Sequence, residues 1–285
     1  MSEIKLEKVS YFHGKDTPYE IKALDDISAL IQHGCITGII GHTGSGKSTL
    51  IQLFNGILKP NEGYVLLDGK NIWEKPKKIR DVRFKVGLVM QYPEYQLFEE
   101  TIAKDIAYGP KNMGLDDEEI EKRVKESAEF VGLSPELLEK SPFDLSGGQK
   151  RRAAIAGIIA MRPDVLVLDE PAAGLDPAGR ESIFQNIKDY QKQSGTTVVI
   201  VSHSMEDMSR YCDRLLVMSG GKIILQGDSK EVFSSAELLE GAGLDIPQVT
   251  KLMLALKERG IELDHAVYTV EDAFEQIIKI YKDIG

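Results

Sequence analysis

The chain has 285 residues and carries 35 Lys and Arg against 45 Asp and Glu, which gives a formal net charge of -10. At roughly 150 residues per domain, this length predicts about two domains. The acidic excess argues against a general nucleic-acid binder, because such proteins carry a basic surface field. With two cysteines and no apolar run near about 18 residues, the sequence predicts neither a zinc centre nor a membrane span, and it fits a reducing compartment.

Short apolar runs alternate with helix-length segments along most of the chain. The predicted strands cover residues 36–40, 86–90, 165–168, 197–201, 215–218 and 222–225. This alternation predicts an α/β fold with a mainly parallel sheet flanked by helices.

The alternation breaks between about residues 92 and 148, where the sequence suggests no strand. Residues 116–131 predict an amphipathic helix, with an apolar face formed by Ile120, Val124, Ala128 and Val131. We therefore expect an inserted helical subdomain over about residues 92–148.

Residues 231–285 predict a small helical module. One helix is expected to begin at Asp245 and Pro247 and to end at Gly260, with an inward face of Val249, Leu252, Met253 and Leu256. Thr269 is expected to cap a second helix, whose apolar stripe is Val270, Phe274, Ile277, Ile278 and Tyr281. Apolar stripes without phosphate-binding groups predict a module that supports dimerisation, and the alternative is that they cover their own domain.

A glycine-rich turn joins the first of the predicted strands to a helix. Residues 41–48 read Gly-His-Thr-Gly-Ser-Gly-Lys-Ser, which fits the phosphate-binding pattern G-x-x-x-x-G-K-[ST]. Lys47 can reach the β and γ phosphates of ATP and Ser48 can hold Mg²⁺, whereas His42 occupies a variable position. The predicted ATP-binding residues here are Gly41, Thr43, Gly44, Ser45, Gly46, Lys47, Ser48 and Thr49. A plain glycine-rich turn with a surface lysine is the weaker alternative.

Two carboxylates end the buried strand at residues 165–168. Ligands of α/β proteins bind at this edge of the sheet, so Asp169 is expected to bind the Mg²⁺ of the nucleotide. Glu170 is expected to orient and deprotonate the attacking water. Acids that only solubilise a strand end are the alternative, which is weak beside a phosphate-binding loop.

A second Ser- and Gly-rich turn precedes a predicted helix at residues 150–160. Residues 145–149 read Leu-Ser-Gly-Gly-Gln, and the nucleotide-binding residues predicted here are Ser146, Gly147, Gly148 and Gln149. One phosphate-binding loop already serves one nucleotide. A second anion-binding helix N-terminus therefore indicates a site that closes on the nucleotide of another subunit, although such a turn alone can be a plain helix cap.

The order of the motifs across about residues 1–230 resembles that of the ATP-binding cassette (ABC) ATPases. These proteins have the P-loop NTPase (RecA-like) fold. The resemblance places Gln91 in the Q-loop, Asp176 in the D-loop and His203 at the switch position. It implies an ABC ATPase domain at 1–230 and a head-to-tail dimer that sandwiches ATP between one P-loop and the partner's signature.

The same resemblance implies the catalytic roles. His203 would contact the γ-phosphate, and Gln91 would sense both Mg²⁺ and the attacking water. With Lys47 and Glu170 these two form the expected catalytic set, and the expected metal-binding residues are Ser48, Asp169 and Gln91.

Two positions depart from the usual pattern of the family. The family places an aromatic residue against adenine just after the first strand, where this chain has His13, next to Tyr11 and Phe12, and the choice among the three stays open. Ala172 stands where Thr or Ser is more usual, which removes a hydroxyl group without touching a catalytic role.

Residues 91–98 read Gln-Tyr-Pro-Glu-Tyr-Gln-Leu-Phe and resemble the Q-helix region of energy-coupling-factor (ECF) transporter ATPases, which import vitamins and some metal ions. Residues 148–157 and 174–180 are similar to that group too. The resemblance implies an ATP-hydrolysing motor subunit, peripheral on the cytoplasmic face of the cell membrane. Its expected partners are a second ATPase subunit, identical or paralogous, a transmembrane scaffold contacted by the segment from Tyr92 to Phe98, and a substrate-binding membrane subunit.

Other functions fit the sequence less well. Another ABC uptake system, for a metal ion or an amino acid, is the nearest alternative. An ABC ATPase acting on nucleic acid is less favoured, because the chain has one motif set and no inserted coiled coil or zinc module. A nucleotide switch without hydrolysis conflicts with the joint presence of Glu170, Gln91 and His203. The basic residues at 75–85 are interrupted by Asp81, which favours a solvated face.

Overall fold

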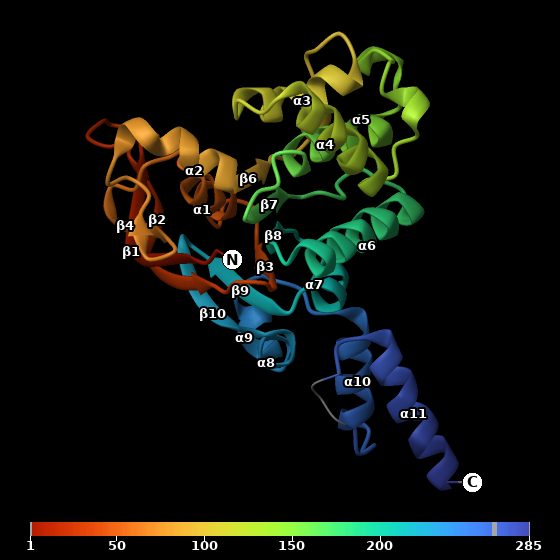
Figure 1. The fold of residues 1–285 in the computed structure, drawn as a ribbon. Coiled ribbons are helices and arrows are strands. Elements are labelled where there is room, and N and C mark those ends of the chain that lie inside the picture. Colours follow the sequence, from red (N-terminus) through yellow and green to blue (C-terminus); the bar gives the residue numbers. More distant parts are fainter. Residues whose placement is uncertain (1, 264–266, 285) are drawn as a thin grey trace.

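The computed structural model describes residues 2–263 and 267–284 (Figure 1). A six-stranded sheet lies at its centre, in the order β10-β9-β3-β8-β7-β6. Its strands are β3 (Ile36–Gly41), β6 (Val86–Val89), β7 (Val165–Asp169), β8 (Thr197–Val201), β9 (Arg214–Ser219) and β10 (Lys222–Asp228). Every neighbouring pair is parallel except β10 with β9. The predicted α/β class with a mainly parallel sheet is confirmed.

A second, antiparallel sheet has the order β2-β1-β4-β5 and was not predicted. Its strands are β1 (Ile4–His13), β2 (Ile21–Ile31), β4 (Glu62–Leu67) and β5 (Lys70–Asn71). In β1, Ile4 and Leu6 are buried while Lys5 is exposed, so the residues alternate as in a strand with one covered face. That alternation was the available signal, but it is interrupted by bulges after Leu6.

Helices cover the sheets and form the rest of the chain. The α-helices are α1 (Lys47–Phe54), α2 (Ile79–Lys85), α3 (Ile102–Asn112), α4 (Asp117–Phe130), α5 (Gly147–Ile159), α6 (Pro177–Ser194), α7 (Met205–Tyr211), α8 (Ser229–Phe233), α9 (Ala236–Gly241), α10 (Gln248–Glu258) and α11 (Val270–Ile284). Short 3₁₀ helices are η1 (Pro76–Lys78), η2 (Pro93–Gln96), η3 (Pro135–Leu137) and η4 (Pro142–Asp144). Within the described ranges, no helix has the length and apolarity needed to cross a bilayer.

The helical region between β6 and β7 contains α3, α4 and α5, which pack on one another at the top of Figure 1. Its helices begin at side-chain caps: the Thr101 hydroxyl accepts from the Lys104 amide, and the Asp116 carboxylate accepts from the Glu119 amide at 2.9 Å. All four residues of the apolar face predicted for α4 are buried: Ile120, Val124, Ala128 and Val131.

Two hydrophobic cores lie on the two faces of the central sheet. Leu50 and Phe54 of α1 pack with the antiparallel sheet on one face. Ile155 of α5 and Phe184 of α6 belong to the core on the other face. Because β7 and β8 are covered on both sides, every residue of these strands is buried.

The C-terminal residues divide between the cassette and a separate cluster. Phe233 and Ile246 join the large core of the cassette, whereas Met253 of α10 belongs to a small cluster with Val267 and Ala273. Figure 1 shows α10 and α11 projecting away from the cassette. The module of α10 and α11 therefore has a small cluster of its own, while Leu254 and Tyr268 pack against the core of the cassette.

Two details of the predicted α10 are wrong. Pro247, not Asp245, occupies the N-cap position, and the Asp245 carboxylate accepts from the Ile246 amide and pairs with Lys251. Leu252 is half exposed, and the buried position beside Met253 is taken by Thr250, whose hydroxyl donates to the Val267 carbonyl at 2.9 Å. Val249 and Leu256 pack against Met253, so the other three residues of the predicted inward face are confirmed.

Helix α11 keeps its apolar stripe on the outside. The Thr269 hydroxyl accepts from the Asp272 amide at 3.2 Å, which confirms the predicted cap. Ala273 faces inward, while the exposed large apolar residues of the helix are Val270, Phe274, Ile277 and Tyr281. Their spacing of four, three and four residues places them on one side of the helix.

The core on the α6 side of the central sheet is expected to be sensitive to the loss of a large side chain. Phe184 is 1% exposed and its ring stacks on Tyr211 with centroids 4.9 Å apart. Phe184→Ala should lower the free energy of unfolding by about 3–5 kcal/mol, measured by urea denaturation, because it leaves a cavity. Phe143→Ala removes a ring that is 89% exposed and should change the value little. Equal losses in both variants would contradict this account of the core.

Candidate nucleotide-binding site

The turn between β3 and α1 has the backbone of a phosphate-binding loop. Gly46 has φ +101°, and a Cβ there would lie 2.7 Å from the Ala23 carbonyl oxygen, so only glycine fits. The Lys47 ammonium donates to the carbonyls of Gly41 at 2.7 Å and His42 at 3.0 Å. Burial lowers the pKa of Lys47, an effect that the nearby carboxylates oppose. The lysine is thus held across the mouth of the loop.

The predicted metal ligands Ser48 and Asp169 are in contact although they are far apart in sequence. Ser48 lies in the first turn of α1 and Asp169 ends β7, and the serine hydroxyl donates to the carboxylate at 3.2 Å. Asp169 is buried, and this burial raises the pKa of its carboxyl. A hydroxyl and a carboxylate oxygen form the kind of donor set that Mg²⁺ prefers.

Glu170 and His203 meet at the same edge of the sheet. The Glu170 Oε1 accepts from His203 Nδ1 at 2.9 Å, and His203 follows β8, which lies directly beside β7. Glu170 has φ +49°, an uncommon conformation for a residue with a side chain, and its amide donates to the Val201 carbonyl. The chain is therefore bent at Glu170 so that the carboxylate leaves the line of β7.

The end of β1 lies against the phosphate-binding helix. His13 Nε2 is 3.3 Å from the Thr49 hydroxyl of α1, and its ring meets Tyr11 edge to face at 5.0 Å. Phe12, the intervening residue, points to the opposite face of the strand, where Lys15 and Lys22 lie over its ring. Of the three aromatic candidates, His13 is both exposed and beside the loop.

Two further predicted residues are exposed at the ends of strands or helices. Gln91 follows β6 and begins the segment that contains η2. Asp176 caps α6, where its carboxylate accepts from the Gly179 amide at 2.7 Å. Ala172, the position that departs from the family pattern, is buried in the large core, where a hydroxyl would need a partner.

The signature residues are the part of the predicted site that one chain does not bring to the P-loop. Ser146 caps α5 in a capping box with Gln149, and Ser146 and Gly147 are exposed. Figure 1 shows α5 in the upper helical region, whereas α1 packs beside the antiparallel sheet. Within the described part of the chain, no hydrogen bond joins residues 146–149 to residues 41–49.

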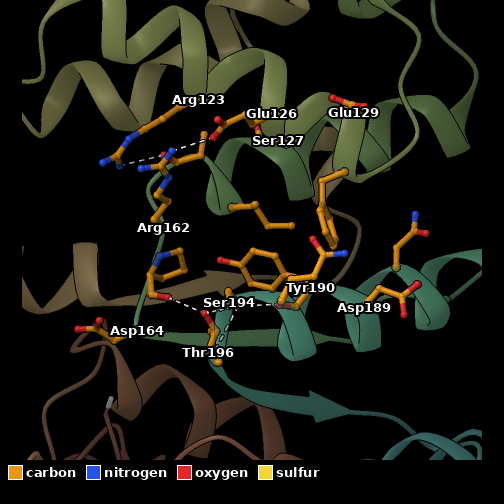
Figure 2. Close-up of a pocket in the computed structure, with 17 residues that line it drawn as sticks. Arg123, Glu126, Ser127, Glu129, Arg162, Asp164, Asp189, Tyr190, Ser194 and Thr196 are labelled. Carbon is orange, nitrogen blue, oxygen red and sulfur yellow. Dashed lines mark hydrogen bonds and ion pairs between the residues drawn. The ribbon is translucent and has the colours of Figure 1, made fainter.

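A large hollow lies elsewhere, between α4 and α6 (Figure 2). Arg123 and Arg162 line it beside Tyr190, and Arg162 is paired with Glu126 and Glu119. None of the predicted site residues lines this hollow. Its cations are already paired with carboxylates of α4, so it does not compete with the strand edge as the nucleotide site.

The chain matches the ABC transporter family over residues 24–173. It is 52% identical to the energy-coupling factor transporter ATP-binding protein EcfA2 of Clostridium tetani, over 98% of both chains. It is 53% identical to the EcfA2 protein of Clostridium perfringens, over 98% of this chain and 99% of that one.

Solved structures agree with the sequence relatives. The structure of cbiO1 from Clostridium perfringens, described as part of the ABC transporter complex cbiONQ, has a TM-score of 0.75 and 41% identity and covers 88% of this chain and 98% of its own. The ATP-binding cassette MJ0796, a dimer bound to ADP and Pi, has a TM-score of 0.72 and 28% identity over 79% of this chain and 98% of its own. The chain therefore belongs to the ABC transporter family and, within it, to the energy-coupling factor transporter ATP-binding proteins, as an ATP-hydrolysing motor subunit.

Proposed function

We propose that this chain drives uptake of a vitamin or another micronutrient, as one of two ATPase subunits bound to a transmembrane scaffold at the cytoplasmic face of the membrane. Relatives with 52–53% sequence identity over nearly the full length of the chain support the ECF assignment. A separate membrane subunit would bind the solute, as the resemblance to the ECF transporters implies.

The observation that carries the ATPase chemistry is the meeting of four groups at one sheet edge. Ser48 contacts Asp169, and Glu170 contacts His203, at the ends of adjacent strands. Ser48 and Asp169 would hold Mg²⁺, with Gln91 as a further ligand, and the ion would neutralise phosphate charge. Lys47 would bind the β and γ phosphates in place of the two carbonyls that it now contacts.

We assign the general base to Glu170, which would accept a proton from the attacking water at its carboxylate. His203 donates to that carboxylate and would thereby fix its orientation as well as contact the γ-phosphate. His13 would stack on adenine, because it is exposed beside Thr49 while Tyr11 supports its ring from behind.

The signature residues and Asp176 would act on the nucleotide of the partner subunit. Ser146 and Gly147 lie exposed at the N-terminus of α5, where backbone amides favour an anion. The dimeric state of the related cassette MJ0796 supports this arrangement. The partner can be a second copy or a paralogue.

The segment from Tyr92 to Phe98 would contact the transmembrane scaffold. Tyr92, Tyr95 and Phe98 are exposed, and Phe98 meets Tyr108 of α3 edge to face at 5.0 Å. Leu97, in contrast, packs against the core, so it supports the segment from beneath. An exposed aromatic surface on an acidic chain fits a protein partner.

We also propose that α10 and α11 support dimerisation. The exposed stripe of α11 lies beside Ala273 on the helix surface, so its own module covers the face around Ala273 and leaves the face with the stripe exposed. A second copy, or a paralogue with the same stripe, would bury the other face.

Replacing the proposed base tests the ATPase assignment. Glu170→Gln keeps the side-chain shape but cannot accept the proton, so hydrolysis should fall by about 10²–10⁴-fold while ATP still binds. Phosphate release and equilibrium nucleotide binding measure the two effects. Glu181→Gln, which changes a half-exposed carboxylate paired with Arg210, is the control. Wild-type turnover in Glu170→Gln would remove Glu170 from the base role.

The proposed scaffold contact can be tested at Tyr95, an exposed residue of the segment. Tyr95 is 84% exposed, so Tyr95→Asp should leave the melting temperature near that of the wild type. It should reduce copurification of membrane subunits from detergent extracts of the native cell, because a carboxylate would be desolvated in the contact. Tyr64→Asp changes an exposed tyrosine of β4 and should not reduce it. Full copurification with Tyr95→Asp would place the scaffold contact elsewhere.

The α11 stripe gives a separate prediction about assembly. Phe274→Asp should lower the dimer fraction in light scattering without loss of the melting transition, because an unpaired carboxylate would enter the apolar contact. Lys279→Asp, an exposed change on the same helix outside the stripe, should have little effect. An unchanged dimer in Phe274→Asp would favour a module that serves only its own chain.

A further inference from the structure

A buried arginine joins three functional segments of the cassette. Arg151 lies in the second turn of α5, five residues after Ser146, and is 3% exposed. Its Nε and Nη2 donate to the two carboxylate oxygens of Glu94 at 3.1 and 2.8 Å. Its Nη1 donates to the Ala173 carbonyl. One side chain of α5, the helix that begins at the signature residues, therefore contacts both the segment from Tyr92 to Phe98 and the loop after Glu170.

The geometry makes this contact directional. The bidentate pair fixes both the distance and the rotation between η2 and α5, because a planar guanidinium matches a carboxylate in one orientation. Both side chains are largely buried, at 4% and 14% exposure, so water does not compete for these hydrogen bonds while the pair is intact. A buried ion pair is weak evidence for stability, and a positioning role accounts better for placing one here.

The third contact reaches the catalytic edge of the sheet. The Ala173 amide donates to the Glu170 carbonyl at 3.1 Å, and Glu170 sits in its strained backbone conformation. Arg151 thus holds the far side of the short turn that begins at the proposed base. The same turn continues to Leu175 and to the cap of α6 at Asp176.

We propose that Arg151 is a positioning residue that transmits nucleotide binding to the scaffold-contacting segment. ATP bound between two subunits would pull on the N-terminus of α5 and on the turn after Glu170. Arg151 would carry the displacement to Glu94 and hence to Tyr92, Tyr95 and Phe98. This inference rests on the proposed function, and it assigns to Arg151 and Glu94 a role that neither the P-loop nor the signature supplies.

The test places a reporter on the moving segment. Gln96 is an exposed residue of η2, so Gln96→Cys can carry an environment-sensitive fluorophore in a Cys35→Ser background, while the buried Cys212 stays. The labelled chain is purified with its membrane partners and titrated with ATP in the presence of EDTA. A fluorescent ATP analogue measures binding separately. The labelled complex that keeps Arg151 should show a change in fluorescence that saturates as ATP is added.

Arg151→Lys keeps the charge but cannot contact all three oxygens. The ATP-dependent signal should fall by about tenfold, while the affinity for the analogue stays within about twofold. Arg152→Lys is the matched control: Arg152 is the next residue of α5, but it donates to Val131 and Ser182 and not to the segment. That variant should keep the signal, which separates positioning from a general loss of helix packing.

Glu94→Gln should lower the signal in the same direction, and the double variant should lower it no further than the stronger single variant. If Arg151→Lys does not fold, Glu94→Gln alone decides the question. A full signal in the folded Arg151→Lys complex, or additive losses in the double variant, would overturn the proposal. A wild-type chain that neither copurifies with membrane subunits nor binds ATP would instead refute the proposed function.

Discussion

The parallel register of β3, β8 and β7 is the constraint on which the site depends. Parallel pairing brings the carboxyl ends of these strands to one edge, where Gly41 ends β3, Asp169 ends β7 and His203 follows β8. The Ser48 hydroxyl then bonds Asp169 across 121 residues of sequence. Complete burial of β7 and β8 fixes this edge, because a one-residue slip would carry the carboxylates out of reach of the P-loop.

The features of the fold that the sequence could predict are those with strong local signals. Unbroken apolar runs mark the buried parallel strands, and the P-loop pattern lies between a strand and a helix, so both were found. The antiparallel sheet was missed because β1 alternates only over a few residues before its bulges. The contact of Arg151 with Glu94 joins positions 57 residues apart, and neither side chain differs in sequence from a solvated charge.

Burial direction is equally hard to obtain from periodicity alone. Leu97 and Tyr95 belong to one short apolar segment, yet Leu97 packs on the core and Tyr95 is exposed. The 3₁₀ turn of η2, entered through Tyr92 at φ +55°, decides which residue points inward. In α10 the polar Thr250 is buried and donates to the Val267 carbonyl, while the apolar Leu252 is half exposed. Such choices depend on neighbours that are distant in the chain.

The unused surfaces of the single chain share one physical explanation. Among the described residues, the start of α5 is exposed, the aromatic residues around η2 contact only other exposed aromatic rings, and the stripe of α11 faces solvent. The two apolar surfaces would be costly as permanent solvent faces, and the three surfaces lie on different elements. A motor that works between two subunits and a membrane scaffold needs three contacts of this kind. Because Arg151 ties the first of these surfaces to the second through a directional ion pair, the proposed route from the nucleotide to the scaffold would run through that pair.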